Sequence, residues 1–258
     1  MTYITGASGF IGQHLLTKLG KDVVKVNYQD LPTFKPKPFD SFFFLSTYGN
    51  MSTHKENGMI WQANVIDLLT TLNKIVKMNF KSFVYVSSSS VKLKTQTMYS
   101  RSKKAAEEIL LSYMEKYKLP ITVIQPYSVT GVGEQAAHLI PTLIRSCMEQ
   151  KLINFVPSPS HDYIDVSDVV DGMLNLSQHS AKGIFELGNG QCFTNQEVLT
   201  LVEKVTGKKA LINEVDSMRA YDNNHWVSMN YRARMYGWIP KKSLTESITE
   251  MVEEYKRT

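Results

Sequence analysis

The segment MTYITGASGFIGQHLLTKLG, residues 1–20, carries the pattern from which the fold can be predicted. Its apolar start, which ends at Tyr3 and Ile4, is followed by three glycines at a spacing of three, Gly6, Gly9 and Gly12. Apolar residues then recur at the spacing of one helix face: Ile11, Leu15, Leu16 and Leu19. This order predicts a short strand, a tight glycine turn and a helix.

A glycine turn between a strand and a helix predicts a dinucleotide-binding site. Gly6 permits the tight turn, Gly9 allows the backbone to approach a pyrophosphate, and Gly12 lets the helix pack closely on the strand. The helix N-terminus adds free N–H groups and the positive end of the helix dipole. A glycine-rich turn without a ligand is the alternative. The candidate cofactor contacts in this turn are Gly6, Ser8, Gly9, Phe10, Ile11 and Gly12.

Strands and helices alternate through the first half of the chain. Strands are predicted at 23–26, 40–47, 83–87 and 121–125, and helices at 58–77 and 99–117. This alternation predicts an α/β fold with a doubly wound parallel sheet, Rossmann-like. After Pro126 the pattern becomes α+β: helices at 138–150, 165–176, 195–206 and 244–255, and a strand at 184–187. We predict a dinucleotide-binding domain over 1–126, which also takes in about 162–189, and a smaller, mainly substrate-binding portion over 127–258.

Size and composition limit the class of protein. The 258 residues include 29 basic and 24 acidic side chains, a net charge of +5, and the basic residues are scattered. Scattered charge argues against a nucleic-acid partner. Cys147 and Cys192 lie far apart without metal-ligand spacing, and the apolar runs fall short of the ~18 residues that span a bilayer. We expect a cytoplasmic protein with no signal peptide, no bound metal and no membrane partner.

The residues after the second predicted strand bear on the choice of cofactor. An acidic side chain there binds the ribose 2′-hydroxyl of NAD, whereas a nearby arginine accepts the 2′-phosphate of NADP. The chain has Asn27 and Tyr28 at this point, and Asp30 comes slightly later. NAD and NADP both stay open. The missing carboxylate favours NADP, as do three nearby lysines: Lys25, Lys35 and Lys37.

Ser88, Tyr99 and Lys103 are spaced so that they can meet at the sheet edge. Tyr99 and Lys103 are four apart and share a helix face, while Ser88 follows a strand at its carboxyl end, where open α/β sheets bind ligands. Beside a nicotinamide, Lys103 and the positive ring would favour the tyrosinate, which requires about 3 pKa units, or roughly 4 kcal/mol. Tyr99 would then exchange a proton with a substrate oxygen as hydride moves, and Ser88 would hydrogen-bond that oxygen. The alternative is that Tyr99 and Lys103 are a Tyr-x-x-x-Lys pair on a helix surface with no part in catalysis.

Eight segments together resemble the extended short-chain dehydrogenase/reductases of the NAD-dependent epimerase/dehydratase family. They are TGASGFIG (5–12), DSFFFLST (40–47), WQANV with Asn64, FVYVSSSS (83–90), YSRSK (99–103), HDYIDVSDVV (161–170), FELGNG (185–190) and YGWIP (236–240). They span nearly the whole chain in the order that the family has.

The resemblance implies an NAD(P)-dependent enzyme with a catalytic set of Ser88, Tyr99 and Lys103 and a substrate lid formed by the second half. It implies a homodimer and, as substrate, a nucleotide-diphosphate sugar. Beyond the glycine turn, the implied cofactor contacts are Asn27, Leu45, Ser46, Thr47, Asn64, Tyr99 and Lys103. The implied substrate contacts are Ser88, Ser89, Ser128 and Arg219.

The chain departs from the family at several points. Only about a dozen residues separate Asn27 from Asp40, so one strand–helix unit is predicted to be lost or reduced to a loop. The sugar dehydratases carry an acidic pair where this chain has Ser89 and Ser90, and serine is a poor proton donor, which argues against dehydration. The family's arginine before D-Y-I is His161 here.

We predict an oxidoreductase or isomerase acting on a nucleotide-activated sugar, as a C4-ketoreductase or C4-epimerase, with hydride transfer to or from nicotinamide and Tyr99 as acid/base. Two alternatives stay open. One is a reductase of a small non-sugar carbonyl compound, and the other is a non-catalytic protein that senses NAD(P).

Overall fold

The structure, a computed structural model, describes residues 1–50, 54, 56–216 and 225–257. The chain divides into two compact units. The first, here the sheet unit, comprises Met1–Pro126, Val170–Glu186 and Tyr231–Trp238. The second unit comprises Tyr127–Val169, Leu187–Asn230 and Ile239–Thr258. Each is described by itself.

A six-stranded sheet in the order β10-β5-β4-β3-β1-β2 forms the centre of the sheet unit. The strands are β1 (Thr2–Thr5), β2 (Val23–Val26), β3 (Ser41–Phe44), β4 (Ser82–Val86), β5 (Ile121–Pro126) and β10 (Gly183–Leu187). The pairs β1–β2, β1–β3, β3–β4 and β4–β5 are parallel. The carboxyl ends of these strands therefore meet at one edge, and the predicted α/β fold with a parallel sheet is confirmed.

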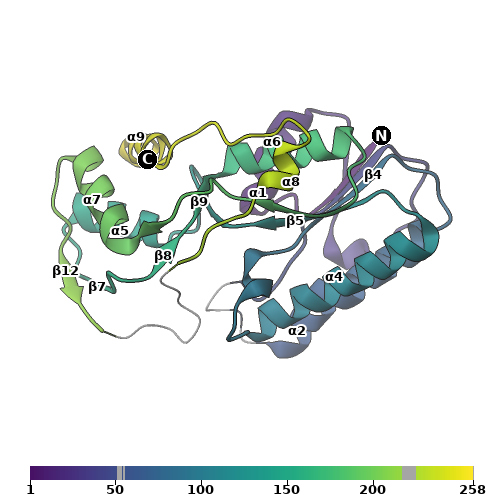
Figure 1. Cartoon of the computed structure of the whole chain (residues 1–258), viewed down its shortest axis with the longest axis horizontal. Coiled ribbons are helices and arrows are strands. Elements are labelled where there is room, and N and C mark those ends of the chain that lie inside the picture. The colour runs from purple at the N-terminus through teal and green to yellow at the C-terminus, as the bar shows by residue number, and fades with distance from the viewer. Residues whose placement is uncertain (51–53, 55, 217–224, 258) are drawn as a thin grey trace. The chain divides into compact units, whose positions relative to one another are not determined.

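Helices lie on both faces of this sheet (Figure 1). On one face are α1 (Phe10–Leu19) and α6 (Val166–Gln178), joined by an ion pair between Lys18 and Asp171 at 3.1 Å. On the other are α2 (Asn57–Trp61), a π-helical turn (Gln62–Ile66), α3 (Asp67–Ile75) and α4 (Met98–Tyr117). The short helix α8 (Tyr231–Arg234) completes the unit.

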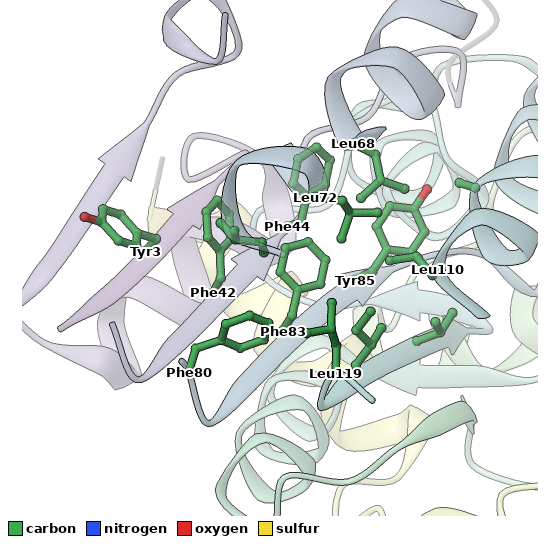
Figure 2. Close-up of a cluster of buried hydrophobic side chains, with 14 of the residues drawn as sticks. Tyr3, Phe42, Phe44, Leu68, Leu72, Phe80, Phe83, Tyr85, Leu110 and Leu119 are labelled. Atoms are coloured by element: carbon green, nitrogen blue, oxygen red, sulfur yellow. The ribbon is translucent and has the colours of Figure 1, made fainter. Parts of the chain in front are cut away.

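The sheet face under α3 and α4 is rich in aromatic side chains (Figure 2). Side chains alternate between the faces of a strand, so Phe42 and Phe44 point to the same side as Phe83 and Tyr85 of the neighbouring strand. They pack against Leu68 and Leu72 of α3 and Leu110 of α4, among others. This core fixes α4, and with it Tyr99 and Lys103, relative to β4.

The predicted loss of a strand–helix unit is confirmed. The chain runs from β2 through one 3₁₀ turn (Tyr28–Asp30) and a loop into β3, and β2 is left as the edge strand of the sheet. Lys74 of α3 supports the loop, since its Nζ donates to the carbonyl oxygens of Leu31 and Pro32 at 2.6 and 2.7 Å.

The second unit is built on three predicted helices, α5 (Leu139–Glu149), α7 (Asn195–Thr206) and α9 (Leu244–Arg257). It also holds short strands that the sequence did not predict. They are β6 (Ser128–Thr130), β7 (Ile153–Phe155), β8 (Ser160–His161), β9 (Tyr163–Asp165), β11 (Phe193–Thr194) and β12 (Ile212–Glu214). They pair as β6–β9, β7–β12 and β8–β11. Among the described residues of both units, no helix combines the length and apolar character needed to cross a membrane.

Candidate active site

The glycine turn lies between β1 and α1 and is packed too closely for side chains. Gly6 has a φ of +69°, and a Cβ there would lie 2.7 Å from the Leu45 carbonyl carbon and the Ser46 nitrogen. A Cβ on Gly12 would lie 2.1 Å from the Gly6 oxygen. Gly9 stands at the N-cap of α1 and is exposed. Since glycine has no side chain to cap the helix, the first-turn N–H groups are left to a ligand or water.

The loop after β3 is held against this turn. The Leu45 amide donates to the carbonyl oxygen and the hydroxyl of Thr5, at 3.3 and 3.1 Å. The Ser46 amide donates to the same hydroxyl at 3.2 Å. The structure therefore brings two predicted cofactor contacts, Leu45 and Ser46, beside the glycine turn.

Asn64 lies in the π-helical turn and is fully buried. Its Oδ1 accepts from the Thr47 hydroxyl at 2.9 Å and the Tyr48 amide at 3.0 Å. Its Nδ2 donates to the Tyr48 carbonyl and the Ser102 hydroxyl, both at 2.8 Å. The side chain thus ties the loop after β3 to α4, and any contact with a cofactor would come in addition to these four bonds.

The structure brings Ser88 and Tyr99 together. Ser88 lies two residues beyond β4, where its hydroxyl caps a 3₁₀ turn by accepting from the Ser90 amide at 3.2 Å. Tyr99 lies in the first turn of α4, which Thr97 caps. The hydroxyls of Ser88 and Thr47 are both hydrogen-bonding neighbours of the Tyr99 phenol. Burial raises the pKa of Tyr99, and these two hydrogen bonds oppose the rise.

Lys103 lies one turn after Tyr99 and is only 1% exposed. Its Nζ donates to the Val86 carbonyl at 2.8 Å and lies 4.7 Å from the ring centre of Tyr85 and 5.9 Å from that of Tyr99. Burial lowers the pKa of Lys103 to about 7, while the negative charge of Glu107 opposes this shift. In the ligand-free chain, both the protonated and the neutral form of Lys103 are therefore populated near neutral pH.

Glu107 is a buried carboxyl that the sequence analysis missed. Gln125 donates to its two oxygens at 2.9 and 3.0 Å, and the Ser87 hydroxyl also hydrogen-bonds to it. Burial raises the pKa of Glu107, against the effect of these hydrogen bonds and of Lys103. Tyr99, Lys103 and Glu107 follow one another at a spacing of four, which is the sequence signal that places them on one helix face.

Asp30 is closer to the end of β2 than its sequence position suggests. The 3₁₀ turn brings its carboxylate back to Asn27, whose Nδ2 donates to it at 3.1 Å. Both side chains are exposed. An acidic group therefore stands beside the position that the sequence analysis found to be non-acidic.

The predicted substrate contacts are divided between the two units. Ser89 is buried in the sheet unit, and the Ser90 hydroxyl beside it has no hydrogen-bond partner within the described part of the chain. Ser128 is half-buried in the second unit, where its amide donates to the Asp162 carbonyl at 3.0 Å. Arg219 falls outside the described residues.

The sheet unit carries the features that an NAD-type cofactor requires. The uncapped start of α1 and the side-chain-free turn fit a pyrophosphate. Tyr99, with hydroxyl neighbours and a buried lysine, lies at the carboxyl end of the same sheet, and a phenol in such a setting can transfer a proton. The described residues contain no cluster of His, Cys, Asp and Glu that could hold a metal ion.

Comparison with known proteins agrees with this geometry. Residues 2–188 match the model of the NAD dependent epimerase/dehydratase family. The chain is 22% identical over 303 residues to an uncharacterized UDP-glucose epimerase, YtcB, of Bacillus subtilis (strain 168), and the match covers 96% of each chain.

Two solved structures share the fold. That of MoeE5 in complex with UDP-glucose and NAD has a TM-score of 0.86 at 21% identity, and the match covers 99% of this chain and 98% of MoeE5. That of RMD from Pseudomonas aeruginosa complexed with NADPH has a TM-score of 0.86 at 20% identity, covering 100% of this chain and 99% of RMD.

The family match spans more than half of the chain and takes in the glycine turn, Ser88, Tyr99 and Lys103. The chain therefore belongs to the NAD-dependent epimerase/dehydratase family of enzymes.

Proposed function

We propose that the protein interconverts nucleotide-activated sugars by oxidation and reduction at C4, as an NAD-dependent C4-epimerase or a C4-ketoreductase. The observation that carries the proposal is the setting of Tyr99: a half-buried side chain whose phenol lies between two hydroxyls, with the Lys103 ammonium 5.9 Å from its ring. A phenol in this setting can take a proton from a sugar hydroxyl, or return one to a keto oxygen.

Ser88 and Tyr99 have separate tasks in this reaction. The tyrosinate removes the proton of the substrate hydroxyl, and the Ser88 hydroxyl donates a hydrogen bond to the same oxygen and holds it in line. NAD, when bound, supplies the hydride acceptor and donor and, in its oxidised form, a positive charge. Because burial raises the pKa of Tyr99 in the ligand-free chain, positive charge close to the phenol is required for the tyrosinate to form near neutrality.

Lys103 holds its own charge close to this phenol. A protonated Lys103 favours the tyrosinate by Coulomb attraction, and the Val86 carbonyl fixes the ammonium. Glu107 supports the ammonium from the next turn of α4, since its negative charge raises the pKa of Lys103.

We infer that NAD rather than NADP is the cofactor. The sequence favoured NADP because Asn27 and Tyr28 are not acidic. In the structure the Asp30 carboxylate lies beside Asn27 at the end of β2, where it would repel a 2′-phosphate and accept from a 2′-hydroxyl. Solved structures of similar fold contain either type of cofactor, since MoeE5 was solved with NAD and RMD with NADPH.

A UDP-sugar is the first substrate to test, because YtcB is described as a UDP-glucose epimerase and MoeE5 binds UDP-glucose. Ser88 and Ser89 in the sheet unit and Ser128 and Arg219 in the rest of the chain remain the proposed substrate contacts. The serines at positions 89 and 90 disfavour a dehydratase, which needs an acid for the departing hydroxyl.

The decisive experiment combines calorimetric titration of NAD and NADP with an assay of UDP-glucose epimerisation. We expect Tyr99→Phe to bind NAD like the wild type and to lose at least about 100-fold in turnover. Tyr113→Phe is the matched control, because Tyr113 lies on the same helix and its hydroxyl bonds to Asn73 instead. Full activity of Tyr99→Phe would contradict the proposal. So would a wild-type protein that binds neither NAD nor NADP.

The same preparation separates the related reactions. Epimerisation leaves the cofactor level unchanged and yields the C4 epimer, whereas a ketoreductase consumes one reduced cofactor per 4-keto sugar. Binding of NAD without binding of UDP, measured in the same calorimeter, would point to a small carbonyl substrate. Binding without any turnover would point to a sensor.

We also infer a homodimer, as the family resemblance implies. Large apolar side chains are exposed on the helical layer of α2, the π-helical turn and α4. They are Trp61, Ile66, Met98 and Tyr117.

A further inference from the structure

Thr47 connects the Tyr99 phenol to a fixed amide. Its hydroxyl donates to the Asn64 Oδ1 at 2.9 Å and is also a hydrogen-bonding neighbour of the Tyr99 oxygen. A threonine hydroxyl has one proton and two acceptor lone pairs. While it donates to Asn64 it can accept the phenol proton, so the order of donation runs from Tyr99 to Thr47 to Asn64.

Asn64 has no freedom to move away from this contact. Three further hydrogen bonds hold its amide: one from the Tyr48 amide, one to the Tyr48 carbonyl and one to the Ser102 hydroxyl. The Ser102 hydroxyl in turn donates to the Tyr99 carbonyl at 2.8 Å, which ties the network to the turn of α4 that carries the phenol. Gly49 of the same loop lies near the phenol ring, since a Cβ built on it would lie 3.4 Å from the Tyr99 Cδ2.

The Thr47 proton has two possible acceptors. When Tyr99 is neutral, the phenol donates and Thr47 keeps its proton toward Asn64. When Tyr99 loses its proton, rotation about the Thr47 C–O bond turns the same proton to the phenolate. The Asn64 Oδ1 still accepts a hydrogen bond after this rotation, because the Tyr48 amide continues to donate to it.

We propose that Thr47 is a positioning residue of the proposed reaction, a hydroxyl that Asn64 holds against Tyr99 and that turns its proton to the phenolate when the substrate proton is being transferred. Sequence analysis predicted Thr47 as a cofactor contact, and this inference gives its side chain a second role. It rests on the proposed function of Tyr99 as acid/base.

Other ionisable side chains also lie around Tyr99. Lys103 lies over its ring, Tyr85 and Glu107 lie beyond Lys103, and His54 stacks on Tyr48 and accepts from the Gly49 amide at 3.0 Å. A substitution at Thr47 leaves each of these four side chains in place. The contribution of the hydroxyl can therefore be isolated by comparing two variants of the same residue.

The test is the ionisation of Tyr99 in the NAD-saturated chain of 258 residues, followed by NMR of protein labelled at the tyrosine Cζ between pH 6 and 10.5. Tyr99→Phe identifies the signal among the 13 tyrosines. Thr47→Val keeps the shape and removes the hydroxyl. We expect it to raise the midpoint by about one pH unit, which is an about tenfold lower ratio of tyrosinate to phenol at any pH below the midpoint. Thr47→Ser keeps the hydroxyl and should retain the wild-type midpoint.

Thr71→Val is the control for loss of a buried hydroxyl, because Thr71 is fully buried and bonds to the Asp67 carbonyl in the same helical layer. Equal midpoints for wild type and Thr47→Val, or equal shifts for the Val and Ser variants, would overturn the proposal. So would a Tyr99 that stays a phenol throughout this pH range. Loss of NAD binding would instead count against the proposed function and would be seen in the calorimeter before any titration.

Discussion

Burial of the Lys103 ammonium costs free energy in the ligand-free chain. The side chain is 1% exposed, and the Val86 carbonyl and the Tyr85 ring replace only part of its hydration. The pKa of Lys103 is therefore lowered to about 7, whereas in the unfolded chain it lies near 10.5. A buried ionisable group that destabilises its own fold in this way is typical of a residue that serves chemistry rather than packing.

Lys103→Met should remove a pH dependence of stability. Between pH 7 and about 10 the unfolded chain holds a proton on Lys103 that the folded chain has lost, so the free energy of unfolding rises with pH, by at most about 1.4 kcal/mol per unit from this group. Below pH 7 both states are protonated and the contribution is flat. Urea unfolding at pH 7, 8 and 9 should show a shallower rise for Lys103→Met. Lys104→Met, at the exposed neighbour, should keep the wild-type rise. Identical slopes in all three proteins would contradict the assigned pKa.

The turn from β1 into α1 requires a residue without a Cβ at position 12. A Cβ on Gly12 would stand 2.1 Å from the Gly6 carbonyl oxygen and 3.0 Å from the Ala7 Cα, and backbone atoms cannot move aside cheaply. We expect Gly12→Ala to lower the melting temperature and to abolish NAD binding.

Gly58→Ala is the matched control for this substitution, since Gly58 lies in α2 with open space around it. Alanine in a helix is favoured over glycine by roughly 0.5–1 kcal/mol, so this control should be slightly stabilised. Thermal melts with and without NAD test both variants. Unimpaired binding by Gly12→Ala would show that the turn can open without cost.

Long periodic elements were predictable from the sequence, and short or irregular ones were not. The helix at 98–117 is long enough for its period to be read, several strands of the sheet stand out as apolar runs, and the glycine spacing marks the first strand–turn–helix unit. The second unit's strands hold two or three residues each, too few to alternate. The π-helical turn around Asn64 has no residue signature, because the extra residue per turn comes from packing. The approach of Asp30 to Asn27 likewise depends on a turn rather than on spacing.

Within the second unit, Asp162 joins two segments that are distant in sequence. The side chain is fully buried and accepts from the amides of Asn189 at 2.7 Å, Gly190 at 3.0 Å and Ser228 at 2.9 Å, and from the Ser228 hydroxyl at 2.6 Å. We expect Asp162→Ala to lower the free energy of unfolding by about 3 kcal/mol or more, because several buried donors lose their acceptor at once. Asp22→Ala, at an exposed position, should change it little. A small effect at Asp162, measured by urea unfolding, would mean that water replaces the carboxylate.

Exposed apolar side chains on α2, the π-helical turn and α4 bear on the assembly of the whole protein. Trp61 is 37%, Ile66 46%, Met98 37% and Tyr117 43% exposed, and all four lie on the helical layer that covers one face of the sheet. Burying such side chains against a second copy would contribute about 25 cal/mol for each Å² of apolar surface removed from water. A two-fold dimer would bring the same layer of both copies together.

Ile66→Asp should therefore convert a dimer into a monomer, because each interface would gain two buried carboxylates, one from each copy. Light scattering coupled to size exclusion measures the mass, against 29.3 kDa for one chain. Ile239→Asp is the matched control, an isoleucine that is 51% exposed and lies in the second unit. It should leave the mass unchanged. A monomeric wild type, or a dimer that tolerates Ile66→Asp and breaks on Ile239→Asp, would contradict the interface inferred here. Because the Tyr99 helix is part of this layer, dissociation with retained NAD binding would also show that the candidate site is complete within one copy.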